Sequence, residues 1–204
     1  MDPALFPRGL AIGFAIAAPV GPIGVLVIRR TLAHGRLAGL VSGVGAASAD
    51  ALYGALAAFG LTFLSSVLVR QSGAIRLGGG VFLCYLGVTT LLSQPAEQVA
   101  AAGWQRLGRA YLSTVFLTLA NPATIISFVA VFAGLGLAGS HAGYASAALL
   151  VLGVFLGSVS WWLLLSGSIG LLRRRFTVTG LRWVNRLSGA IILAFGVAAL
   201  VSLL

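Results

Sequence analysis

The chain has 204 residues, of which 59% are apolar and only 8% are charged, and its formal net charge is +10. Soluble domains carry about a quarter charged residues, so this composition excludes a soluble globular domain, a disordered chain and a disulfide scaffold. Roughly 20 apolar residues cross a bilayer as one helix, so the length suits about six spans with short loops. We expect an all-α polytopic membrane protein that forms a single transmembrane domain over residues 1–204 of the chain.

Six apolar runs predict six transmembrane helices. In chain order they are Leu10–Ile28, Leu37–Leu64, Leu77–Leu92, Tyr111–Leu135, Tyr144–Leu172 and Leu187–Leu204. The first run also resembles a signal peptide, which would give way to a polar mature chain. Because the run instead stays apolar as far as Ile28, we expect a retained helix.

The 13 basic residues are all arginines, and they lie in short clusters between the apolar runs. Six spans place Arg8, Arg70 and Arg76 on one side of the membrane. The other side receives Arg29, Arg30, Arg36, Arg106, Arg109, Arg173, Arg174, Arg175, Arg182 and Arg186. The positive-inside rule assigns this second side to the cytoplasm and both termini to the outside. No basic stripe alternates with exposed aromatic residues, so we expect no nucleic-acid partner.

The two halves of the chain resemble each other. Pro22 and Pro122 are 100 residues apart in broken apolar runs. At a spacing of 110, three further pairs match: Gly43 and Gly153, Ala47 and Gly157, Asp50 and Ser160. Three helices per half make the second half enter the membrane from the opposite side, as in many secondary transporters. This predicts two inverted three-helix repeats, about residues 1–93 and 107–204, with chance similarity between glycine-rich helices as the alternative.

Two proline-containing breaks are the strongest candidates for a substrate site. Pro19 and Pro22 each remove a backbone N–H donor, and Gly21 between them adopts conformations closed to other residues. Backbone groups freed in the membrane are tolerated only inside protein or along a wet cavity. Such a break therefore either kinks the helix for packing or exposes backbone groups to a ligand. Asn121, before Pro122, could bind a substrate through its amide or satisfy its own kinked backbone.

Asp50 is the only acid well inside an apolar run. An ionised Asp at a helix centre costs on the order of 3 kcal/mol on insertion scales, so such residues usually face the bundle interior and mark transport pathways. Gly43, Ala47 and Gly54 share its helical face, which makes a narrow stripe of small residues. We expect Asp50 to carry a proton or to pair with a substrate ammonium group, with a purely structural hydrogen bond as the alternative.

Small residues four apart predict close helix packing. Gly39 and Gly43 form one such face and Gly153 and Gly157 another. A homodimer through a glycine face is a candidate assembly that follows from the same feature. Trp161 follows the stripe of the fifth apolar run, where it would line a substrate cavity or pack between helices.

No group of residues predicts catalysis. His34 and His141 lie in opposite loops, and the single Cys84 lies in an apolar run, where we expect it to pack as a small residue. These residues and one central acid supply neither a nucleophile–base pair nor a metal triad. We therefore expect no enzyme and no cofactor.

Several motifs together resemble the LysE/RhtB family of amino-acid exporters. The run Pro19-Val20-Gly21-Pro22 with the following Gly35, Gly39, Gly43, Gly45 and Asp50 resembles the family's opening signature. Tyr85-Leu86-Gly87 is similar to its third-helix motif, Leu119-Ala120-Asn121-Pro122-Ala123 to its Asn-Pro motif, and Gly157 through Trp161 to its fifth helix. The resemblance covers nearly the whole chain in order.

This resemblance implies an exporter in a bacterial inner membrane. In that membrane, a multi-pass chain whose termini the arginines place outside has periplasmic termini. Its substrate would be an amino acid or a close derivative, driven by the proton gradient or the membrane potential. The site carried over by the resemblance is Pro19, Gly21, Pro22 and Asp50 with Asn121 and Pro122. Many members read Pro-Gly-Pro in the first motif and carry a lysine soon after the Asn-Pro motif, and this chain departs from both patterns. The departures leave the substrate class open. Two alternatives remain: an exporter of another small solute and a non-transporting membrane scaffold. A metal cation is disfavoured as that solute, because the one central acid has no histidine or thiol beside it.

Overall fold

The described part of the chain is entirely helical. The computed structural model describes residues 4–19, 21–58, 72–92, 104–121, 124–125, 127–128, 144–172, 178–201 and 203. These residues contain seven long helices and no strand. The helices are α1 (Leu5–Ala17), α2 (Pro22–His34), α3 (Arg36–Ala58), α5 (Ser72–Leu91), α6 (Trp104–Leu119), α8 (Tyr144–Leu172) and α9 (Val178–Val201). The predicted all-α class is confirmed for these residues.

Three helices are long and apolar enough to cross a membrane: α3, α8 and the Arg182–Val201 part of α9. The pair α1 and α2, bent by 80°, adds a fourth when it is counted as one broken span. The sequence predicts the bounds of α8 correctly, whereas α9 begins at Val178 rather than at Leu187. The C-terminal parts of the predicted helices Leu37–Leu64 and Tyr111–Leu135, together with His141 and the run Arg173–Arg175, lie outside the described residues.

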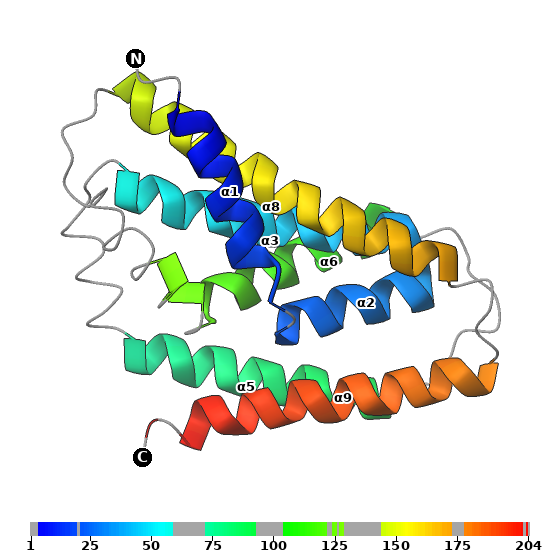
Figure 1. Cartoon of the computed structure of the whole chain (residues 1–204). Helices are drawn as coiled ribbons and strands as arrows, with labels where there is room; N and C mark the ends of the chain where they lie inside the picture. Colours follow the sequence, from blue (N-terminus) through cyan, green and yellow to red (C-terminus); the bar gives the residue numbers. More distant parts are fainter. Residues whose placement is uncertain are drawn as a thin grey trace.

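The helices form two closely packed groups (Figure 1). In the first, α8 packs along α1 and α3, and α3 also packs on α6. In the second, α5 and α9 run antiparallel side by side. The helix α2 contacts α3 and α8 on one side and α9 on the other, so it joins the two groups. The first turn of α1 and the last turn of α9 lie at the same end of the molecule.

Glycines lie where α1 and α8 approach most closely. A Cβ on Gly153 or Gly157 of α8 would meet the backbone of Leu10 in α1. From the other side, a Cβ on Gly9 or Gly13 would meet the backbone of α8. Small residues allow the two helix backbones to come this close. Close packing is what stabilises such a helix pair, since lipid supplies no hydrophobic force between helices.

The α5–α9 pair uses the same device. Gly80 and Gly87 of α5 face Gly196 and Gly189 of α9, so each helix supplies two glycines spaced seven residues apart. Cys84 lies between them, where its Sγ would be 2.7 Å from a Cβ on Gly196. Its predicted role as a small packing residue agrees with this position.

Substituting one α8 glycine tests the α1–α8 contact. We expect Gly157→Ala to lower the free energy of unfolding by about 1–3 kcal/mol relative to Gly167→Ala, because an extra methyl group overpacks the contact. Gly167 is the matched control, since it lies on the same helix with nothing within 4 Å of its Cβ position. Thermal unfolding of the purified protein in detergent measures the difference. Equal stability of the two variants would show that the contact does not hold the bundle together.

Candidate functional site

Asp50 lies at the contact between α3 and α8, inside the bundle. Its side chain is only 3% exposed. The Ser158 hydroxyl donates a hydrogen bond of 2.7 Å to the Asp50 Oδ2 atom. The indole Nε1 of Trp162 in turn donates to the Ser158 Oγ atom at 3.1 Å. A short chain of polar groups therefore crosses an otherwise apolar helix contact.

Small residues on α3 bring α8 this close. The predicted stripe of Gly43, Ala47, Asp50 and Gly54 is buried along its whole length. Gly54 faces the Val154 side chain of α8, at 3.5 Å from its own Cβ position. A larger side chain in this stripe would push α8 away and lengthen the hydrogen bond to Asp50.

Gly39 and Gly43 lie about three and two helical turns before Asp50 on α3. Gly39 faces the hydroxyl groups of Thr31 in α2 and Ser166 in α8. Gly43 faces the Trp162 side chain, so the indole that donates to Ser158 rests directly on α3. These two glycines thus lie at contacts within the chain.

The serine that meets Asp50 is not the one matched to it in the sequence. Ser160 lies 110 residues after Asp50, but its hydroxyl donates to the Leu156 carbonyl of its own helix at 2.7 Å. Ser158 lies 108 residues after Asp50 and makes the contact. Only its place beside Gly157 on the small-residue face of α8 could have indicated Ser158 from the sequence.

The first break separates α1 from α2. The N–H of Gly21 donates to the Pro19 carbonyl at 2.9 Å, and α2 begins at Pro22. Neither proline can donate to the carbonyl four residues before it. Nothing lies within 4 Å of the Cβ position of Gly21, so the backbone borders open space there. The first-turn amides of α2 have no helical partners of their own, which makes this helix start a potential anion site.

The second break follows α6. The N–H of Asn121 donates to the Thr118 carbonyl at 3.2 Å. The Asn121 carbonyl accepts hydrogen bonds from Thr124 at 3.1 Å and Ile125 at 3.3 Å. Asn121 therefore ends one helical segment and begins the next turn. Pro122 lies outside the described residues.

The two breaks share a local pattern. At the first, the Gly21 carbonyl accepts from the N–H of Val25 at 3.0 Å, four residues later. At the second, the Asn121 carbonyl accepts from the N–H of Ile125, also four residues later. Gly21 and Asn121, which are 100 residues apart, thus occupy the same place relative to the turn that follows each break.

Tyr53 links the second break to Asp50. Tyr53 lies one helical turn after Asp50 on α3, and its hydroxyl donates to the Leu119 carbonyl at 2.6 Å. Leu119 is the last residue of α6, so this bond ties the end of that helix to α3. The Tyr53 ring also packs on Phe128 beyond the break, with ring centroids 5.5 Å apart.

The first break reaches the same region from the other side. Ala17 and Ile23, on either side of the break, pack in one apolar cluster with Ala46, Ala47 and Trp162. Because Trp162 donates to the serine that binds Asp50, the first break is one contact away from the polar chain. Both breaks therefore flank the α3–α8 contact at the level of Asp50.

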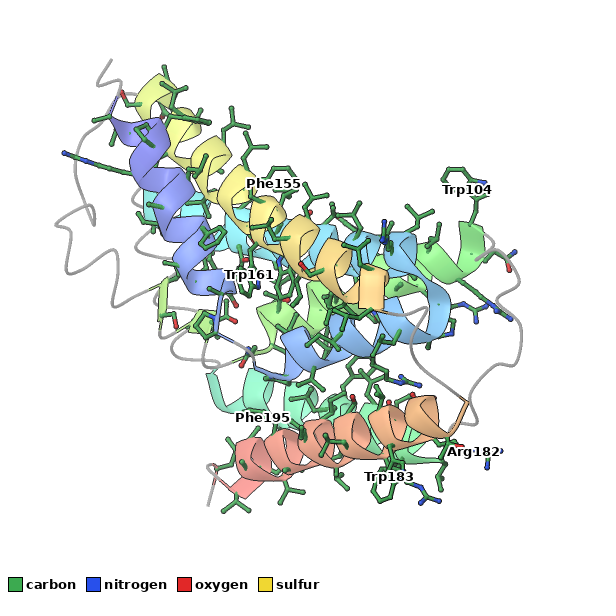
Figure 2. All side chains as sticks on the ribbon, turned by 45° about the vertical axis from the view of Figure 1, so that its right-hand side comes forward. Trp104, Phe155, Trp161, Arg182, Trp183 and Phe195 are labelled. Atoms are coloured by element: carbon green, nitrogen blue, oxygen red, sulfur yellow. The ribbon has the colours of Figure 1, made fainter. Side chains whose placement is uncertain are left out.

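Trp161 packs against α1 near the first break. Its ring meets the Phe14 ring edge to face, with centroids 5.4 Å apart. Figure 2 shows Trp161 near the C-terminal end of α1. An indole at this position could contact a molecule that enters between α1 and α8, and it also stabilises the helix pair as it stands.

The chemistry open to this site is binding and proton exchange. A single carboxyl with hydroxyl and indole neighbours can hold a proton or a cation, and the helix start after Pro22 can hold an anionic group. Within the described residues, no three His, Cys, Asp or Glu side chains lie together as a metal site.

Two serine substitutions distinguish the hydrogen-bond partner of Asp50. We expect Ser158→Ala to lower the free energy of unfolding by about 1–3 kcal/mol, because it leaves the Asp50 carboxyl and the Trp162 N–H buried without their partner. Ser160→Ala is the control, since it loses only a bond to its own helix. Thermal unfolding in detergent provides the comparison. A larger loss for Ser160→Ala would contradict the observed pairing.

Comparison with known proteins identifies the family. Residues 14–203 match the LysE type translocator family. The "Putative amino acid efflux protein YcgF" of Bacillus subtilis (strain 168) is 26% identical over 197 residues, which cover 94% of this chain and 93% of that protein. The "Threonine efflux protein" of Escherichia coli (strain K12) is 24% identical over 197 residues, covering 92% and 93%.

A third relative is more similar over a shorter stretch. The "Uncharacterized membrane protein YahN" of Escherichia coli (strain K12) is 31% identical over 140 residues, which cover 65% of this chain and 61% of that protein. No solved structure matches this chain. Because the family match spans nearly all of a chain built from apolar helices, the chain belongs to the LysE type translocator family of membrane transport proteins.

Proposed function

We propose that this protein is a secondary-active exporter of amino acids or close derivatives in the bacterial inner membrane. Two of its relatives are named as efflux proteins, one for amino acids and one for threonine. The observation that carries the proposal is the buried Asp50 carboxyl between two broken helices. Discontinuous helices at the contact of two repeats are the usual place for a transporter's substrate site.

The proposed topology has six spans in two inverted three-helix repeats. The helix contacts support it, because α1 packs on α8 as α6 packs on α3, and these two pairs are equivalent under such a repeat. The α5–α9 contact pairs the third helix of each half. Gly80 contacts Gly196 there, and Gly87 contacts Gly189. Exchanging the two halves of the chain exchanges these two contacts.

The proposed orientation places both termini in the periplasm. The arginines of α2, α6 and α9 support it by lying at one end of the bundle: Arg29 and Arg30 line one pocket with Arg106, and Arg29 bonds to Asn185. Figure 2 shows Arg182 at this end as well. An arginine-rich end is typical of the cytoplasmic side.

In the proposed binding mode, the substrate lies between the two breaks. The amides of the first turn of α2 bind the substrate carboxylate, with the Asn121 amide as a second polar contact. Asp50 faces the substrate ammonium group or exchanges a proton with it. Trp161 borders the path between α1 and α8. The proposed site therefore comprises Pro19, Gly21, Pro22, Asp50, Asn121, Pro122 and Trp161.

Coupling is proposed to depend on whether Asp50 is accessible. A side chain that is 3% exposed exchanges no proton with bulk water until the helices around it move. Alternating access around the two breaks would open Asp50 to one side of the membrane at a time. Proton binding and release at Asp50 would then accompany each substrate movement.

Efflux from preloaded cells tests this function. We expect cells with the wild-type protein to export one class from a labelled panel of amino acids and dipeptides, and Asp50→Asn cells to export no more than cells without the protein, because Asn cannot carry the proton or the charge. Asp2→Asn is the matched control, since it makes the same chemical change at the N-terminus. Immunoblots of membrane fractions check that each variant is inserted.

Three outcomes would change the proposal. Wild-type export by Asp50→Asn would make Asp50 a structural residue. No export of any panel member by inserted wild-type protein would favour another small solute or a non-transporting scaffold. Transport by the purified protein in liposomes, without a partner, would then exclude the scaffold.

A further inference from the structure

A basic pocket lies at the arginine-rich end of the bundle, away from Asp50. It has a volume of about 300 Å³ and lies between the end of α2, the start of α3 and the start of α6. Its polar lining consists of Arg29, Arg30, His34, Arg106, Arg109 and Ser113. This volume is at the lower end of the range for small-molecule sites.

Among the residues that the structure describes, no carboxylate lines this pocket. The whole chain has only three acids, Asp2, Asp50 and Glu97, against 13 arginines, and Asp50 is bonded to Ser158 elsewhere. Four guanidinium groups gathered in one pocket repel one another, and the repulsion grows where the groups are shielded from water. An anion that enters the pocket relieves this repulsion.

Arg30 is held in place by the helices around it. Its guanidinium donates to the hydroxyls of Ser42 at 2.9 Å, Ser113 at 2.8 Å and Thr114 at 2.8 Å, and to the Ala110 carbonyl at 2.8 Å. These neutral partners hold the guanidinium in place and carry no charge that would offset its own. Arg30 therefore supplies a fixed positive charge at the inner wall of the pocket.

The rim of the pocket is formed by two exposed arginines. Arg106 and Arg109 lie within one turn of α6, and both side chains are exposed. Arginine forks match the geometry of phosphate oxygens and bind them through paired, charge-assisted hydrogen bonds. A ligand seated against the fixed Arg30 can thus be covered by two side chains that are able to adjust to it.

We propose that this pocket binds a phosphate group. The lining excludes a free amino acid as the fitting ligand, since a zwitterion would bring an ammonium group next to four arginines without an acid to pair with it. A phosphate carries only negative charge and several acceptor oxygens. The site is separate from the proposed transport site and does not depend on what that site transports.

The phosphate could come from an anionic lipid headgroup or from solution. The surroundings favour the lipid, because Trp104 begins the same helix with 90% of its side chain exposed, and Figure 2 shows it projecting at this end of the bundle. Exposed Leu112 and Phe116 continue the same helix away from the pocket. Tryptophan prefers the headgroup level of a membrane, and basic pockets between helices bind anionic headgroups.

Native mass spectrometry with added lipid tests the proposal. We expect the wild-type protein to bind phosphatidylglycerol in preference to phosphatidylcholine, and Arg106→Gln/Arg109→Gln to weaken that binding at least about tenfold, because charge-assisted hydrogen bonds are lost. The matched control is Arg182→Gln/Arg186→Gln, which removes two exposed arginines at the same end but outside the pocket. It should change the binding less than about twofold, in keeping with solvent-exposed charges.

Added inorganic phosphate distinguishes the two sources. Binding of phosphatidylglycerol that resists millimolar phosphate assigns the pocket to a lipid, whereas displacement by phosphate that depends on Arg106 and Arg109 assigns it to a soluble phosphate. Equal weakening by the two double variants would overturn the proposal, since only the general charge of the surface would then matter. Unchanged binding by Arg106→Gln/Arg109→Gln, or displacement of the lipid by a free amino acid, would overturn it as well.

Discussion

The contact between α3 and α8 places a carboxyl group where a bilayer supplies no water to hydrate it. Asp50 must therefore take its hydrogen bonds from the protein, and the Ser158 hydroxyl donates one, while the Trp162 indole donates to Ser158. This hydrogen bond requires a short distance between the two helices, and the small residues along α3 allow that distance. Because a buried polar group left unpaired in an apolar interior is costly, any motion that separates α3 from α8 has to give Asp50 a new partner. A substrate, a proton or water can fill that role, which links helix movement to binding.

Glycines allow two helix pairs to pack closely. Gly153 and Gly157 lie where α8 packs against α1, and the glycines of α5 and α9 lie where the other pair is in contact. Among the described residues, one polar tie to the second group is the hydrogen bond that the Arg29 Nε of α2 donates to the Asn185 Oδ1 of α9, at 3.3 Å. Two closely packed helix groups next to broken helices agree with the alternating access proposed above.

The sequence predicts what depends on local pattern and misses what depends on how helices cross. Apolar length was enough to predict α8, and helical spacing was enough to place Asp50 on a buried small-residue face. The partner of Asp50 could not be predicted, because alignment of glycines points to Ser160 whereas the crossing of two helices selects Ser158. Arg30 shows the same limit. Its place between apolar runs predicts a residue at the membrane edge. In the structure its guanidinium donates to side chains of α6 more than 80 positions away in the chain, which no local pattern encodes.

We propose that Asp50 carries the proton that couples export to the gradient. Proteoliposomes with a pH-sensitive dye inside, given an outward gradient of the exported amino acid, measure this directly. We expect the wild-type protein to change the internal pH as the amino acid leaves. Asp50→Asn should produce no pH change, even where it still exchanges labelled for unlabelled amino acid. Proton movement by Asp50→Asn at the wild-type rate would contradict the proposed role of Asp50 as the proton carrier.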